Sequence, residues 1–149
     1  MPQLSLHSPV GDLTLFEDDG ALVALEWGWV ERQDRTALLT AARDQLDRYF
    51  DGNGCAFDLP LAPRGTAFQR RAWRHLMTIP AGRTETYGEA ARALGSSPRA
   101  VGMACAANPI PIIIPCHRIV AAGGRPGGYS GDGGLDTKFA LLRLEGASL

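Results

Sequence analysis

The sequence has little of what would build a disulfide-rich or metal-dependent protein. Its 149 residues include only three cysteines and three histidines. No two cysteines form a C-x-x-C pair, and the odd count argues against both a disulfide framework and a cysteine-rich zinc site. We therefore expect free thiols, no metal and no cofactor.

Long apolar runs are also missing. The longest stretches fall far short of the ~20 residues that cross a bilayer. The start, Met-Pro-Gln-Leu-Ser-Leu-His, lacks the basic segment and following apolar segment of a secretory signal. A hydrophobic content of 45% is ordinary for a folded chain. Together with the missing signal and membrane-spanning runs, it leads us to expect a cytoplasmic protein without membrane contact.

The net charge of −1 conceals an uneven distribution. Residues 1–60 hold 4 arginines against 11 acidic residues, a charge of −7, whereas residues 61–149 hold 11 basic residues against 5 acidic ones, a charge of +6. This asymmetry favours a polyanionic partner for the C-terminal part. A chance split of surface charge is the alternative.

The N-terminal part has the pattern of a small α/β lobe. Partly alternating apolar residues between turn sequences predict short antiparallel strands, and apolar residues at helical spacing predict a helix over 36–50. Two prolines indicate an extended linker over 55–65, so the domains are placed at 1–62 and 63–149. The predicted strands are residues 3–8, 12–17 and 21–27.

The C-terminal part is predicted to be mainly helical. Two short helices, 87–94 and 98–107, are separated by a Gly-Ser-Ser turn and form a helix-turn-helix candidate. A third helix begins after Thr66 and a last one spans 135–146. The fold class is therefore an α/β lobe followed by a mainly α, winged-helix-like domain.

The second helix of this pair is unusual for a DNA reader, because it offers small residues and a single arginine, Arg99, near its start. Small residues allow a helix to approach another surface closely. One interpretation is a core helix packed on its neighbours. The other is a helix pressed into a narrow groove, with Arg99 as a probe.

The pattern Pro115-Cys116-His117-Arg118 is the strongest indication of a reactive site in the sequence. A cysteine nucleophile acts as its thiolate, whose free pKa is about 8.5, and so needs a base or a positive charge nearby. His117 and Arg118 offer both, and Glu145 could orient the imidazole. Because neighbouring side chains of an extended chain point apart, we expect a water between Cys116 and His117. The alternative is an inert, packed cysteine.

The run from Asn108 to Val120 resembles the active-site sequence of the O6-alkylguanine-DNA alkyltransferases, and the resemblance extends over about residues 65–147. It implies single-turnover repair of double-stranded DNA by a monomer, in which an alkyl group on O6 of guanine, and on O4 of thymine, moves to Cys116 after base flipping from the minor groove. The other matching segments are Phe68–Trp73, Ile79–Gly82, Thr86–Glu89, Arg99–Gly102, Gly128–Gly131 and Lys138–Gly146.

The resemblance also implies roles for single residues. Cys116 resembles the alkyl acceptor, His117 the base that acts through water, and Glu145 the group that holds this base. Tyr87 is similar to the residue that protonates guanine N3. Asn108 is similar to the residue that ties the recognition helix to the active-site loop.

Further contacts follow from the same resemblance. Arg99 resembles the finger that fills the base stack, and Tyr129 and Ser130 belong to a loop that closes over the extruded base. The remaining expected contacts are Tyr87, Ala100, Gly102 and Arg118 on DNA, and Pro111, Ile119 and Cys105 in the substrate pocket.

Two other functions stay open beside alkyl transfer. An alkyltransferase-like protein would bind the lesion without accepting the group, but such proteins lack the acceptor cysteine, which is present here. A cysteine hydrolase would need an oxyanion hole, which no feature of the sequence specifies.

The turn before Arg99 is shorter than in many relatives, which could shift this residue.

Overall fold

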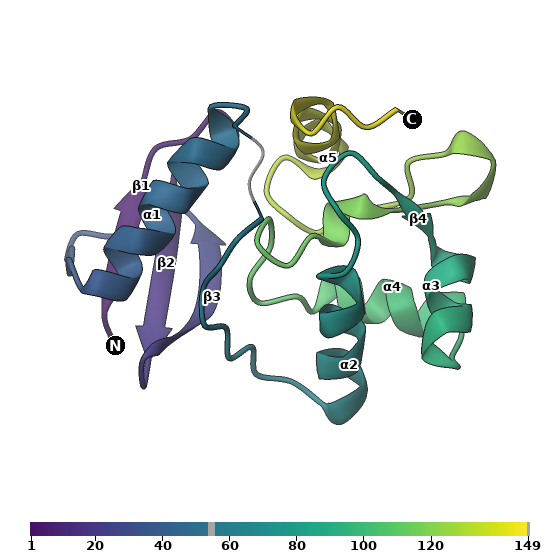
Figure 1. Ribbon diagram of the computed structural model, residues 1–149, viewed down its shortest axis with the longest axis horizontal. Coiled ribbons are helices and arrows are strands. Elements are labelled where there is room, and N and C mark those ends of the chain that lie inside the picture. The colour runs from purple at the N-terminus through teal and green to yellow at the C-terminus, as the bar shows by residue number, and fades with distance from the viewer. Residues whose placement is uncertain (54–55, 149) are drawn as a thin grey trace. The chain divides into compact units, whose positions relative to one another are not determined.

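The computed structural model describes residues 1–53 and 56–148, and the chain divides into two compact units, Met1–Arg64 and Gly65–Leu149 (Figure 1). The boundary between the units therefore lies two residues after the boundary that the sequence predicts, which is at residue 62. Cys55 lies outside the described residues. In the described parts of the chain, no helix is long and apolar enough to cross a membrane.

The first unit is a three-stranded antiparallel sheet with one helix across a face (Figure 1). Leu13 and Leu15 alternate along the middle strand and are fully buried. Thr36 caps the helix, as its side chain accepts from the Leu39 amide at 3.0 Å. The predicted α/β lobe is confirmed. Its elements are β1 (Gln3–Leu6), β2 (Leu13–Asp18), β3 (Ala21–Trp27) and α1 (Ala37–Phe50).

Two details of this unit differ from the prediction. The first strand ends at Leu6 rather than at residue 8, because the chain turns where the Gly11 amide donates to the Ser8 carbonyl at 3.1 Å. The expected linker is partly ordered by pairing. Leu22 exchanges backbone hydrogen bonds with Pro60 and Ala62, at 2.9 and 2.8 Å.

The second unit is mainly helical, as predicted. Its helices are α2 (Ala67–Leu76), α3 (Tyr87–Leu94), α4 (Pro98–Ala106) and α5 (Gly134–Leu144). Thr66, Thr86 and Ser97 cap the first three through their hydroxyl groups. Gly95 ends α3 in the left-handed conformation, at φ 64°, which lets the chain reverse into α4. These two helices are the predicted helix-turn-helix pair.

A short parallel ladder in this unit was not predicted. β4 (Glu85–Thr86) pairs with β5 (Ile119–Val120), so that Glu85 lies opposite Ile119. The ladder places the start of α3 beside the chain that follows Cys116. Between α4 and the ladder, the Pro-rich segment is almost fully buried, as expected. Its apolar core consists of Ile110, Ile112, Ile113 and Ile114.

Candidate active site

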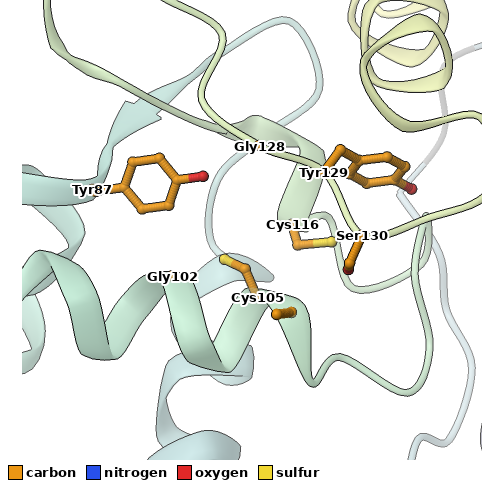
Figure 2. A pocket seen from close by; sticks show the side chains of 8 residues that line it. Tyr87, Gly102, Cys105, Cys116, Gly128, Tyr129 and Ser130 are labelled. Atoms are coloured by element: carbon orange, nitrogen blue, oxygen red, sulfur yellow. The ribbon is translucent and has the colours of Figure 1, made fainter.

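A pocket of about 220 Å³ opens in the second unit, and the Cys116 side chain lines it (Figure 2). The other walls come from three places: the first residue of α3, the pocket side of α4 and the loop before α5. The full lining is Tyr87, Gly102, Cys105, Ala106, Cys116, Gly128, Tyr129 and Ser130.

Backbone pairing and one amide side chain bring these segments together. The β4–β5 ladder sets Tyr87, the residue after Thr86, beside the strand that follows Cys116. Asn108 lies just beyond α4, where its Nδ2 donates to the Ile114 carbonyl at 2.8 Å and its Oδ1 accepts from the Ile110 amide at 3.0 Å. Asn108 therefore fixes the Pro-rich loop to the end of α4.

Cys116 is only 5% exposed, and it begins a single 3₁₀ turn that ends at Arg118. Burial raises the pKa of its thiol, although a hydrogen bond from Asn108 and the charge of Lys138 both act in the opposite direction. The resting cysteine is therefore a thiol, and it must lose its proton to a nearby base before it can attack.

His117 is completely buried, and its Nε2 lies 2.7 Å from Glu145 Oε2. Burial lowers the pKa of this imidazole despite the neighbouring carboxylate. A neutral ring that donates through Nε2 to Glu145 leaves a lone pair on Nδ1. Among the described residues, this Nδ1 atom has no hydrogen-bond partner, so it is available to accept a proton.

Arg118 completes this buried group. Its Nε and a terminal guanidinium nitrogen each donate to Glu145 at 2.9 Å, and its other terminal nitrogen donates to the Ile79 carbonyl at 2.6 Å. This two-point contact holds the carboxylate in one orientation. Glu145 in turn holds the imidazole of His117.

Lys138 is the second buried cation of the unit, with no exposed surface. Its ammonium donates to the carbonyls of Ile119 at 2.6 Å and Gly128 at 2.9 Å. Burial lowers the pKa of this ammonium. Lys138 thus ties the pocket loop to β5, and its charge favours the thiolate of Cys116.

Tyr87 points its hydroxyl group into the pocket (Figure 2). Burial raises the pKa of this phenol, and a hydrogen bond from the Gly128 backbone amide partly offsets the effect. Gly127 has φ +73°, and a Cβ atom at this position would lie 2.8 Å from the Tyr87 ring. The absence of a side chain at Gly127 therefore leaves the room that the phenol occupies.

The buried imidazole should make stability depend on pH. In the unfolded chain the pKa of His117 is about 6.5, whereas burial keeps its pKa in the folded protein lower. As the pH falls below about 6.5, only the unfolded state takes up this proton. The free energy of unfolding should then fall by up to about 1.4 kcal/mol per pH unit. Urea unfolding from pH 8 to pH 5 checks this slope, and a His117→Asn variant with an unchanged slope would contradict it.

Comparison with known proteins assigns both units of the chain. Residues 67–147 match the family described as "6-O-methylguanine DNA methyltransferase, DNA binding domain". Residues 4–63 match its partner, "6-O-methylguanine DNA methyltransferase, ribonuclease-like domain". The chain belongs to the O6-methylguanine DNA methyltransferase family.

Relatives within this methyltransferase family align over nearly the full chain. The methylated-DNA–protein-cysteine methyltransferase of Mycolicibacterium paratuberculosis is 44% identical, over 95% of this chain and 90% of its own length. That of Methanosarcina acetivorans is 41% identical, over 95% and 96%. The solved structure of Mycobacterium tuberculosis OGT in complex with DNA has a TM-score of 0.86 at 42% identity, over 97% of this chain and 93% of its own.

Most site residues expected from the methyltransferase resemblance lie together. Cys116, Tyr87, Cys105, Tyr129 and Ser130 line the pocket, as does Gly102, which was expected at the DNA. His117 and Glu145 form a hydrogen-bonded pair next to Cys116, and Asn108 joins α4 to the active-site loop. Arg99 is exposed near the start of α4, and Ala100 is half-buried beside it.

Three expectations need correction. Arg118 was expected to contact DNA, but its guanidinium faces inward, because it is bound to Glu145 and the Ile79 carbonyl. Pro111 and Ile119 are not among the pocket-lining residues. Pro111 lies in a tight backbone bridge with Ile114, and the Ile119 side chain is fully buried in the core.

Sequence reasoning missed two functional features of this methyltransferase site. Lys138 was noted only within a matching segment, although a lone lysine amid apolar helix residues could have indicated a buried cation. No role was predicted for Gly127, and Gly128 was named only as the first residue of a matching segment. Their contact with Tyr87 depends on a fold that spacing along the chain does not reveal.

Proposed function

We propose that this protein repairs alkylated DNA in a single turnover, by moving the alkyl group from O6 of guanine to Cys116 Sγ. The observation that carries the proposal is the pocket itself. It brings a proton-donating phenol, Tyr87, and a buried thiol into one cavity, and the thiol adjoins the His117–Glu145 pair. These are a nucleophile, a base with its orienting carboxylate and an acid.

The proposed transfer conserves atoms and charge. The thiol proton passes through a water to the open Nδ1 of His117, and Sγ attacks the alkyl carbon. The carbon–O6 bond breaks as the carbon–sulfur bond forms, while Tyr87 gives a proton to N3 so that guanine leaves uncharged. The proton on His117 is then transferred to the phenolate of Tyr87, which restores the phenol. The thioether offers no easy route of hydrolysis, so each molecule reacts once.

The proposed substrate is double-stranded DNA, bound by a cytoplasmic monomer through α3 and α4 from the minor groove. The solved relative in complex with DNA supports DNA binding, and the charge of +6 on residues 61–149 supports a polyanionic partner. The damaged base has to leave the stack, at a cost of a few kcal/mol. Methyl groups on O6 of guanine are the main proposed substrate, and O4-methylthymine is a second one.

Intact mass spectrometry tests the proposal directly. After incubation with a duplex that contains O6-methylguanine, the protein should gain the mass of one methyl group. Cys116→Ala should gain nothing, whereas Cys105→Ser, altered at the other thiol of the pocket, should still gain it. Tight binding of the lesion without any gain in mass would instead support a lesion-binding protein that accepts no alkyl group.

Arg99→Ala should separate base flipping from chemistry. If Arg99 fills the gap in the base stack, its removal should slow transfer from duplex DNA by about tenfold or more, because a cationic side chain no longer offsets part of the unstacking cost. Transfer from the free base O6-benzylguanine, which needs no flipping, should stay within about twofold. Equal losses on both substrates would show that Arg99 has another role.

A further inference from the structure

α4 carries a long apolar side chain on its outer surface. Met103 is 64% exposed, the largest exposed fraction among the large apolar side chains that the structure describes. A single exposed methionine needs no special explanation. The position of Met103 on α4, however, indicates a role for this side chain.

Met103 shares a helix face with Arg99 and adjoins residues that line the pocket. The two residues are four positions apart, so their side chains are neighbours on the helix surface. Both are exposed, whereas Val101 and Ala104 face the core. Gly102 and Ala106, on either side of Met103, line the pocket. Met103 therefore lies between two pocket-lining positions of α4.

The rest of this face is made of small residues. The sequence of α4 is Pro-Arg-Ala-Val-Gly-Met-Ala-Cys-Ala, in which Arg99 and Met103 are the two long side chains. A smooth helix surface with two projecting side chains suits a narrow groove. Arg99 supplies charge, and Met103 supplies a flexible, polarisable, apolar group that adapts to irregular surfaces.

We propose that Met103 is a second DNA probe of this protein, an apolar side chain that packs in the minor groove next to the position vacated by the flipped base. The inference rests on the proposed function. Methionine is among the apolar residues that minor-groove proteins press against base steps. Its contribution is independent of phosphate charge, so Met103 adds affinity that salt does not screen.

Binding and transfer by Met103 variants test this inference. Met103→Ala should weaken binding to an undamaged duplex about tenfold, which corresponds to about 1.4 kcal/mol of lost apolar contact. Transfer from a methylated duplex below saturation should fall by a similar factor. The rate with free O6-benzylguanine should not change, and neither should the slope of log Kd against log salt concentration. Met103→Leu should retain wild-type binding, and Met103→Gln, of similar length but polar, should resemble the alanine variant.

Met77→Ala is the matched control, because Met77 is also exposed, at 39%, but follows α2 rather than lying on α4. It should bind and react like the wild type. Wild-type affinity in Met103→Ala, or an equal loss with duplex and free base, would overturn the inference. The binding measurement needs no alkyl transfer, so a failure of the chemistry at Cys116 remains distinguishable from a failure at Met103.

Discussion

Replacing Glu145 by alanine should destabilise the second unit by about 3–5 kcal/mol, because the substitution leaves the buried guanidinium of Arg118 without its carboxylate. The Glu145 side chain is 1% exposed, and its carboxylate accepts hydrogen bonds from His117 and from two nitrogens of Arg118. The midpoint of thermal unfolding should fall on the order of 10 °C. Calorimetry and urea titration at pH 7 measure both quantities.

Transfer should suffer as well, under conditions where the variant is still folded. Without Glu145, the His117 ring loses the bond that keeps its proton on Nε2, and the base for Cys116 is lost with it. We expect transfer to slow by about a hundredfold or more, the usual contribution of a positioned base. Glu145→Gln keeps the volume of the side chain but cannot accept from both partners, so it should lose transfer while it remains easier to keep folded.

Asp132→Asn is the matched control, since it neutralises an exposed acid of the same unit. It should change the free energy of unfolding by no more than about 0.5 kcal/mol. A Glu145→Ala protein that unfolds within 1 kcal/mol of the control would show that Arg118 finds water or another acceptor. The buried group formed by Glu145, His117 and Arg118 would then not be the structural centre of the site.

The elements of the fold were predictable because their determinants are local. Capping residues such as Thr86 and Ser97, and the glycine that ends α3, lie next to the helices they delimit. Alternation in the first strands likewise concerns neighbouring residues. The β4–β5 ladder was missed, because two paired strands of two residues each carry no periodicity, and their pairing joins positions 34 residues apart.

The site shows the same division between local and long-range information. Cys116, His117 and Tyr87 lie in matching motifs, so their participation could be predicted. The direction of the Arg118 side chain could not, because a cation next to a nucleophile can face DNA or the core with the same sequence. In the structure, Arg118 donates to Glu145. The cation whose charge lowers the pKa of the Cys116 thiol is Lys138, which lies 22 residues further along the chain.

Lys138→Met is therefore the most informative change outside the motif. Methionine has a similar length, but it leaves the carbonyls of Ile119 and Gly128 without their donor. The loop that donates to Tyr87 should loosen, so transfer should slow by about a hundredfold, the usual worth of a positioned acid. Stability should also fall, since each unsatisfied buried carbonyl costs about 1–3 kcal/mol.

A pH profile distinguishes an electrostatic role of Lys138 from a purely structural one. Its charge lowers the pKa of the Cys116 thiol, so the methionine variant should have a higher thiol pKa and less thiolate at any given pH. The alkylation of Cys116 by a small neutral reagent, followed by peptide mass spectrometry, should then move to higher pH. Tyr87→Phe is the control, because it should slow transfer without moving this profile. If the profile of Lys138→Met coincides with that of the wild type, the lysine only holds the loop, and its charge does not set the pKa of the Cys116 thiol.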